Sequence, residues 1–327
     1  MRPADYLRLT LLAAIWGASF LFMRVASPQF GAVNTAFLRV FFGCAGLLVI
    51  LLIMRRTFRF DGKLKPALLL GVINSGIPFF MYCLAAQWLP AGYSAILNAT
   101  TPLMGALIGF AFFAETLTAR KWLGVMMGLA GIVVITTVGE SQSSAHLLWG
   151  VAACLLATAC YGLAGFLTRR WISEKGGLDA RLVAFGSQLG ATLFLLPFFG
   201  FSVTTGPAVN WAQPMVWGSV IAVGLLCTAV AYILYFRLIA DIGPMRSLTV
   251  TFLIPPFGIF SRVMADSVLT RHKNHRCRRY PRNHLRIMPG TGRHATVCAP
   301  GGSGRILHTA DQGFIKHHRL KTRQLTG

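Results

Sequence analysis

The sequence predicts an all-α integral membrane protein with about nine transmembrane helices, and three observations support this. Of its 327 residues, 55% are hydrophobic and only 12% are charged, about half the charged share of an ordinary soluble domain. The mean hydropathy is +0.61. The apolar residues also come in runs of about 20, the length that a helix needs to cross a hydrocarbon core ~30 Å thick. Much of the surface is therefore expected to face lipid.

The predicted spans follow one another with short connections. Their ends are defined to within a few residues: about 9–26, 32–54, 66–88, 91–114, 121–138, 147–168, 180–202, 215–238 and 244–264. Helices suit these runs, because an open chain in lipid must satisfy its own backbone hydrogen bonds and the runs lack the alternation of barrel strands. No cleavable signal peptide is expected, because the first run is long enough to span.

Lys and Arg residues occur in alternate connections, which predicts the orientation. The basic connections follow the second, fourth, sixth and eighth spans, with Arg55, Arg56, Arg59, Lys63, Lys65, Arg120, Lys121, Arg169, Arg170, Lys175, Arg181, Arg237 and Arg246. The intervening connections, SPQFGAVN, QWLPAG, GESQSSAH and FSVTTGPAVNWAQP, contain neither Lys nor Arg. Because cytoplasmic connections carry the excess of Lys and Arg, we expect a multi-pass protein of the inner membrane with a cytoplasmic N-terminus.

An internal repeat divides the membrane part into residues 1–140 and 141–264. WGASFLFMR (16–24) aligns with YGLAGFLTR (161–169) at an offset of 145. Later matches have an offset of 153: Tyr82 with Tyr235, Ser94 with Ser247, Pro102 with Pro255 and Gly105 with Gly258. A repeated unit of five spans places its second copy upside down relative to the first. Such inverted repeats are typical of transporters that alternate around a midplane site.

These residues resemble the EamA family of the drug/metabolite transporter superfamily. The resemblance rests on the WGASFLFMR start, Arg39 early in the second span, the short Gly/Pro connection before the fourth span, and TTPLMGALIGFAFFAETLTARKWLGVMMGLAGIVVI (100–135). It implies ten spans, both termini in the cytoplasm, and transport of small metabolites. The substrates of this family are diverse, so the resemblance implies no particular one.

The chain departs from that pattern after about Phe260, where a tenth span is expected. Residues 265–327 form a basic, non-membrane tail without an apolar run, and they hold 13 of the 31 Lys and Arg residues. One interpretation is a disordered arm that binds anionic lipid or nucleic acid. A second is a metal site with His272, His275 and Cys277 as ligands. The third is a frameshift product without a selected function.

Two observations favour the frameshift. Moving the reading frame forward by one nucleotide across 273–284 yields a stretch rich in Gly, Ala, Val, Ile and Thr, similar to GVMMGLAGIVVI at 124–135. Nine spans would also leave this basic tail outside the cell, against the charge rule. We therefore predict neither a metal site nor a nucleic-acid partner.

Polar residues and prolines inside the spans are the candidate substrate-path residues, because unpaired polar groups in hydrocarbon are costly and tend to line a path. They are Trp16, Ser19, Arg39, Asn74, Tyr82, Asn98, Thr101, Pro102, Tyr235, Thr251 and Pro255. Each also has a structural interpretation. Arg39 could extend to the lipid headgroups, the aromatic residues could simply pack, and Thr101 could satisfy the backbone carbonyl that Pro102 leaves free.

Nothing in the sequence indicates catalysis or a cofactor. There is no phosphate-binding loop for ATP, no CxxC pair among seven cysteines, and within the spans only His146, at an edge. The sequence therefore predicts a secondary transporter of small metabolites or drugs, with the lipid bilayer and a small solute as its partners. The rival interpretations are a membrane-embedded enzyme, a non-transporting scaffold and an inactive frameshifted fragment. The oligomeric state is not predicted.

Overall fold

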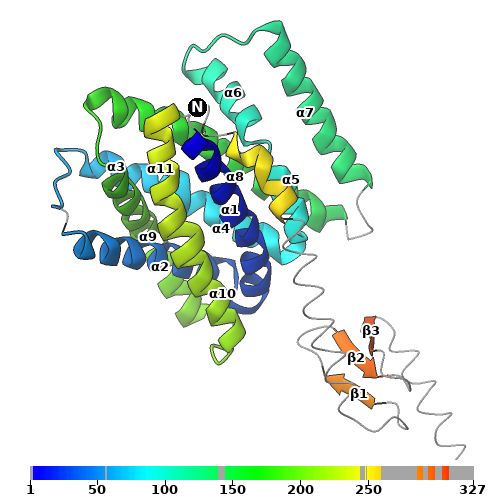
Figure 1. The fold of residues 1–327 in the computed structure, drawn as a ribbon. Coiled ribbons are helices and arrows are strands. Elements are labelled where there is room, and N and C mark those ends of the chain that lie inside the picture. Colours follow the sequence, from blue (N-terminus) through cyan, green and yellow to red (C-terminus); the bar gives the residue numbers. More distant parts are fainter. Residues whose placement is uncertain are drawn as a thin grey trace, which may run out of the picture. The chain divides into compact units, whose positions relative to one another are not determined.

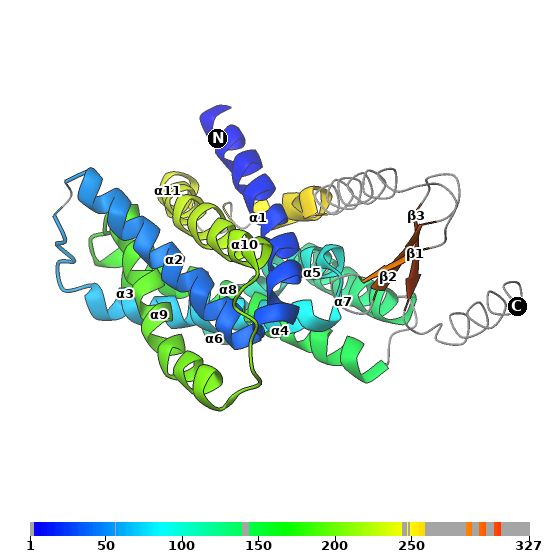
Figure 2. The same ribbon diagram turned by 90° about the horizontal axis from the view of Figure 1, so that it is seen from below.

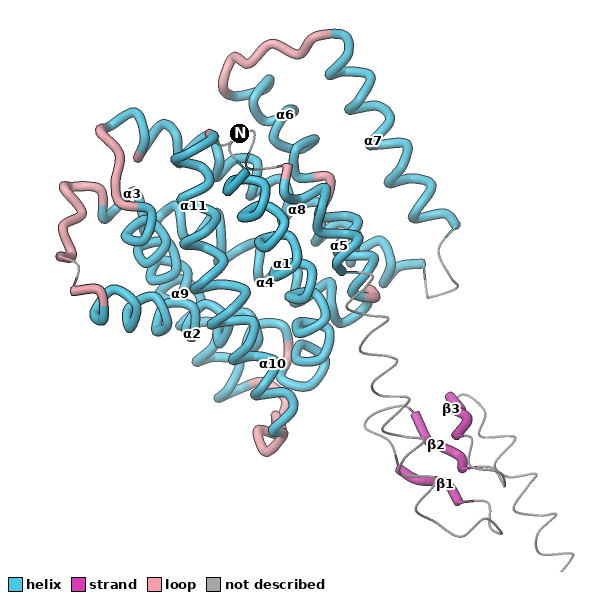
Figure 3. Tube along the Cα trace, in the orientation of Figure 1, coloured by secondary structure: helices cyan, strands magenta, loops and turns pink. Residues whose placement is uncertain are grey.

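The computed structural model describes residues 3–55, 57–138, 144–243, 247, 249–258 and three short strands near the C-terminus. It separates into two units, Met1–Arg262 and Val263–Gly327. The described secondary structure of the first unit is helical, with short connections between the helices (Figures 1 and 3). This confirms the prediction of an all-α membrane protein.

The helices of the first unit coincide with the predicted spans. They are α1 (Pro3–Phe30), α2 (Ala32–Ile53), α3 (Leu64–Gly71), the π-helix η1 (Val72–Gly76), α4 (Ile77–Trp88), α5 (Ala91–Asn98), α6 (Thr101–Phe112), α7 (Ala119–Val138), α8 (Ser144–Trp171), the 3₁₀ turn η2 (Ser173–Lys175), α9 (Ala180–Thr205), α10 (Pro214–Gly224), the π-helix η3 (Leu225–Val230) and α11 (Ala231–Ile242). Residues 250–258 are also helical and lie within the ninth predicted span.

Seven helical segments among the described residues are long and apolar enough to cross a membrane. Two of them are the continuous stretches Leu64–Trp88 and Pro214–Ile239, each of which contains a π-helix. These seven match the first four and the sixth to eighth predicted spans. The helix α7 occupies the fifth, and the end of the ninth lies outside the described residues.

The two π-helices occupy equivalent positions in the repeat. η1 begins at Val72 and η3 at Leu225, an offset of 153. A π-helix widens one turn and interrupts the regular backbone pattern, and such turns occur often at functional sites. The third span of each copy thus contains a π-helix at the same position.

The two copies of the repeat approach each other closely at glycines in the helix crossings, and four of these glycines form two matched pairs. A Cβ added to Gly71 would lie 1.9 Å from the carbonyl oxygen of Ser187, and one added to Gly224 would lie 3.1 Å from that of Arg39. Gly71 and Gly224 are related by the offset of 153, and Arg39 and Ser187 by 148.

A second matched pair joins the first helix of each copy to the fourth helix of the other. A Cβ on Gly17 would lie 2.9 Å from the backbone nitrogen of Gly258, and one on Gly162 would lie 2.8 Å from the Cα of Gly105. Small residues allow this close approach of backbones. The α2 and α9 helices also pack against each other (Figure 2). Each copy therefore packs against the other through equivalent surfaces.

The second unit contains a small antiparallel sheet in the order β1-β2-β3. Its strands are β1 (Arg286–Pro289), β2 (His294–Cys298) and β3 (Gly304–His308), with Arg286 opposite Cys298 and His294 opposite His308. The strands are the part of the basic tail that the structure describes. His272, His275 and Cys277 lie outside the described residues, and the frameshift origin stays a prediction.

Candidate functional site

A cavity lies among the helices of the first unit, with about 560 Å³ of empty space including its mouth. Nine of the eleven predicted substrate-path residues line it: Trp16, Ser19, Arg39, Asn74, Tyr82, Asn98, Thr101, Tyr235 and Thr251. Pro102 and Pro255 do not. The other lining residues, which sequence reasoning missed, are Phe20, Met23, Phe79, Tyr161, Tyr232, Val250 and Ile254.

Both copies of the repeat contribute equivalent residues to this cavity. The related pairs are Trp16 with Tyr161, Phe79 with Tyr232, Tyr82 with Tyr235, Asn98 with Thr251 and Thr101 with Ile254. The repeat was the signal that could have identified Tyr161 and Tyr232, because each aligns with an aromatic lining residue of the first copy. The cavity thus lies between the two copies rather than inside one of them.

Arg39 is the charged group of this site. Its side chain is 3% exposed, so it is buried among the helices rather than extended to the surface. Nε donates a hydrogen bond to Thr228 Oγ1 at 3.2 Å, and Nη1 lies 3.1 Å from the sulfur of Met23. The guanidinium carbon is 3.5 Å from the centroid of the Phe79 ring, a cation–π contact.

The π-helix η3 positions the hydrogen-bond acceptor of Arg39. The Thr228 hydroxyl donates to the carbonyl oxygen of Val223 at 2.9 Å, which leaves its oxygen free to accept from Arg39. The carbonyl of Cys227 accepts a hydrogen bond from Trp16 Nε1 at 3.2 Å. The widened turn therefore presents both a side-chain and a backbone acceptor to residues that line the cavity.

The equivalent π-helix η1 supports a neutral network. Gln188 Nε2 donates to Ser75 Oγ at 2.9 Å, and Ser75 Oγ lies 3.0 Å from the Tyr232 hydroxyl. That hydroxyl donates to the carbonyl oxygen of Asn74 at 3.1 Å. All four residues are buried, and these hydrogen bonds satisfy most of their polar groups, although Oε1 of Gln188 has no hydrogen-bond partner among the described residues.

The residues near Pro102 have largely structural contacts. Proline lacks the N–H that would bond the carbonyl of Asn98, and Thr101 Oγ1 donates to that carbonyl at 2.7 Å. The Asn98 side chain accepts from the Tyr82 hydroxyl at 2.8 Å. Thr101 therefore satisfies the carbonyl that Pro102 leaves free, and Pro102 itself does not line the cavity.

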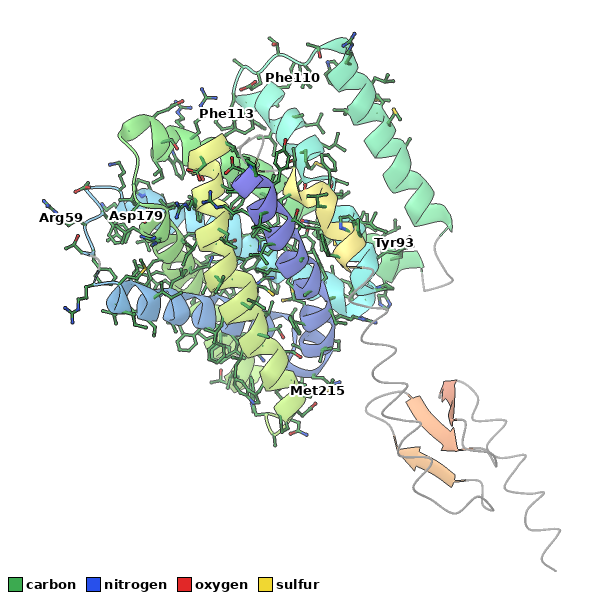
Figure 4. The ribbon with its side chains drawn as sticks, in the orientation of Figure 1. Arg59, Tyr93, Phe110, Phe113, Asp179 and Met215 are labelled. Carbon is green, nitrogen blue, oxygen red and sulfur yellow. The ribbon has the colours of Figure 1, made fainter. Side chains whose placement is uncertain are left out.

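Several contacts join residues at or near the ends of different helices. Arg8 of α1 pairs with Asp241 of α11 at 2.9 Å, and a shallow depression joins Arg59 and Asp179. Figure 4 shows these last two residues together, well away from Met215 at the start of α10. Among the connections without Lys or Arg, Gln213 Nε2 donates to Gln29 Oε1 at 3.3 Å and the rings of Trp88 and His146 stack at 5.9 Å. Connections predicted on the same side of the membrane thus contact one another.

Comparisons with known proteins relate this chain to membrane transporters. Residues 6–137 match the EamA-like transporter family. The chain is similar to YoaV of Bacillus subtilis, an uncharacterized transporter, with 24% identity over 251 residues that cover 75% of this chain and 83% of that protein. It is similar to YedA of Escherichia coli, an uncharacterized inner membrane transporter, with 23% identity over 257 residues that cover 76% and 78% of the two chains.

Two further similarities extend this result. A probable terminal-alkyne amino-acid exporter of Streptantibioticus cattleyicolor is 26% identical over 173 residues, which cover 52% of this chain and 54% of the exporter. A solved crystal structure of a protein superimposes with a TM-score of 0.59 at 19% identity, and it covers 81% of this chain and 91% of its own. The superposition supports the fold. The named relatives indicate a transporter.

Proposed function

We propose that this member of the EamA-like transporter family is a secondary transporter that moves a small solute across the inner membrane by alternating access. The substrate-path residues predicted from the sequence would then form its binding site. The observation that supports this proposal is the cavity between the two copies, which equivalent aromatic and polar residues of both copies line. Sites at the interface of repeats are the usual arrangement in secondary transporters.

The sidedness of the protein is part of the proposal. We place the N-terminus and the basic connections in the cytoplasm and the connections without Lys or Arg outside. In this arrangement the ion pair of Arg8 with Asp241 closes helix ends on the cytoplasmic side, and the stacked rings of Trp88 and His146 do so on the other side. Alternating access requires these two sets of contacts to open in turn.

Transport by purified protein in liposomes tests the function. Vesicles loaded with one of a panel of unlabelled amino acids, organic acids, amides and nucleosides should accumulate the matching labelled solute by counterflow. Trp16→Ala, in the cavity, should abolish counterflow. The matched control is Trp149→Ala at an exposed position of α8, which should leave counterflow unchanged.

A non-transporting scaffold is the rival function. It predicts no counterflow for any solute of the panel, although the protein is folded and correctly inserted. Labelling of single cysteines in the 55–65 and 201–214 connections of intact cells tests the sidedness separately, because only the second should react with an impermeant reagent.

A further inference from the structure

We propose that the transported solute is a monocarboxylate with an apolar body, and that the Arg39 guanidinium binds its carboxylate inside the cavity. This inference rests on the proposed transport function and adds the chemical class of the solute to it. Three features of the described residues support it: the charge of the cavity, the counterpart of Arg39 in the other copy, and the chemistry of the cavity wall.

The cavity contains one positive charge that no described residue neutralises. Among the described lining residues only Arg39 is charged, and none of the ion pairs between described residues includes it. Its contacts are a hydroxyl, a thioether sulfur and an aromatic ring. A buried guanidinium is costly unless an anion pairs with it. A solute that supplies the anion would therefore bind with a gain that a neutral solute lacks.

The other copy shows that this charge is not needed to build the helix crossing. Ser187 occupies the position equivalent to Arg39, and its backbone makes the corresponding close contact with Gly71. A Cβ added to Gly71 would lie 1.9 Å from the carbonyl oxygen of Ser187, whereas one added to Gly224 would lie 3.1 Å from that of Arg39, so the helices approach more closely at Ser187. The equivalent crossing in the second copy thus forms without a guanidinium, so the charge of Arg39 is available for a role beyond holding the helices together.

The geometry of the guanidinium selects the kind of anion. Its planar fork has five N–H donors and matches a carboxylate with two parallel hydrogen bonds. The described hydrogen bonds of Arg39 use Nε and Nη1, and none of them uses Nη2. A single cation neutralises a single negative charge, so the site favours a monoanion over a phosphate ester or a dicarboxylate.

Much of the rest of the cavity lining is aromatic. The rings of Trp16 and Tyr235 lie 5.2 Å apart, and Tyr82 stacks on Tyr161 at 6.1 Å, all of them in the cavity lining. Such surfaces favour an apolar or aromatic body through burial and ring stacking. The combination of one guanidinium and several rings indicates a small carboxylic acid whose remainder is apolar.

Ligand-induced stabilisation of the purified full chain tests this inference without the need for transport. The probes are phenylacetate and 4-methylpentanoate, each with its uncharged amide as the matched control. A ligand that binds the native state raises the unfolding temperature by an amount that grows with the logarithm of its concentration divided by its dissociation constant. We expect both acids to raise it, and both amides to bind about 10- to 100-fold more weakly because they lack the charge-assisted hydrogen bonds.

Variants assign the effect to Arg39. Arg39→Gln should abolish the preference for acid over amide, Arg39→Lys should retain the preference with weaker binding, and Ser187→Ala should leave it unchanged. Equal binding of acids and amides to the natural chain would overturn the inference, even if Arg39→Gln failed to fold.

The outcomes also separate this inference from the proposed function. Counterflow of neutral or cationic solutes without any binding of the acids would refute the carboxylate site and leave a transporter. Selective binding of the acids without counterflow would support the site and argue against transport.

Discussion

Two crossings in this protein have the same backbone arrangement and different chemistry. Where α2 passes the start of η3, Arg39 donates to Thr228. At the equivalent crossing of α9 with η1, Gln188 donates to Ser75. Thr228 and Ser75 are related by the repeat, and a glycine precedes each of them at the closest approach of the helices. The glycines and hydroxyl residues thus build the scaffold twice, whereas the charge is confined to one copy.

The largest effect is expected from adding a Cβ atom at a glycine where the helices cross. The Cβ of Gly71→Ala would lie 1.9 Å from a backbone oxygen, which cannot move aside as a side chain can. We expect a loss of about 3 kcal/mol or more in the free energy of unfolding, at the upper end of the cost of overpacking. The measurement is thermal unfolding of the purified protein in detergent.

Gly224→Ala sharpens this comparison because the contacts of its added Cβ are less severe, at 2.5 Å from the Cβ of Phe42 and 3.1 Å from the carbonyl oxygen of Arg39. We expect about 1–3 kcal/mol, less than for Gly71→Ala. Gly218→Ala is the control on the same helix α10, since nothing lies within 4 Å of its added Cβ. Equal losses for Gly71→Ala and Gly218→Ala would show that the close crossing does not matter.

The next largest effects are expected from exchanging the side chains at positions 39 and 187 between the two copies. Arg39→Ser gives the first copy the residue of the second, and we expect a folded protein whose counterflow is at least about tenfold slower, the loss of one charge-assisted hydrogen bond. Ser187→Arg buries a second cation, and we expect it to destabilise the protein by about 3 kcal/mol. Unfolding temperature and counterflow together report both results. Normal counterflow of Arg39→Ser would refute a role for the charge.

A smaller effect is expected in the neutral network. Tyr232→Phe removes a hydroxyl that contacts Ser75 and donates to Asn74, so these groups lose a partner in the interior. We expect a cost of about 1–2 kcal/mol in thermal unfolding. Phe79 occupies the equivalent position in the first copy without a hydroxyl, which shows that the ring alone fits. The control is Tyr6→Phe at an exposed position, and an identical loss there would contradict this assignment.

The smallest effect is expected at the helix ends. Arg8→Gln removes the ion pair between α1 and α11, whose Asp241 side chain is partly exposed. Such pairs contribute about 0–1 kcal/mol, so the unfolding temperature should change by little. Counterflow is the more sensitive readout, because this pair is proposed to close the cytoplasmic side and its loss should change the rate in one direction more than in the other.

Hydropathy and the repeat were sufficient to predict the helices and most of the cavity. The spans follow from the length and continuity of the apolar runs. Trp16, Arg39 and Tyr82 were identified because polar or aromatic groups are conspicuous within such runs. The two π-helices could not be predicted, since VINSG and LLCTAV have no distinctive composition and the widened turn depends on tertiary contacts.

Other parts of the site also depended on the folded arrangement. Pro102 was selected for the carbonyl that it leaves free, but Thr101 bonds that carbonyl from within the same chain segment. The repeat could have identified Tyr232 as the counterpart of Phe79, but its hydrogen bond to the carbonyl oxygen of Asn74 in η1 is visible only in the folded arrangement. The sequence shows which residues are unusual in a membrane, whereas their partners follow from the crossing of helices far apart in the chain.

The buried guanidinium also has an electrical consequence. In the proposed transport cycle, a bound monocarboxylate would make the site neutral, so the loaded carrier would cross the membrane field without moving net charge. The empty site keeps one positive charge, and its return would be sensitive to voltage, by about 2.3 kcal/mol per 100 mV if the charge crossed the whole field. A cell with a negative interior would then hold the empty site facing inward, ready for the next anion from the cytoplasm. Through the charge of Arg39, the membrane potential would thereby favour export of the anion in the proposed cycle.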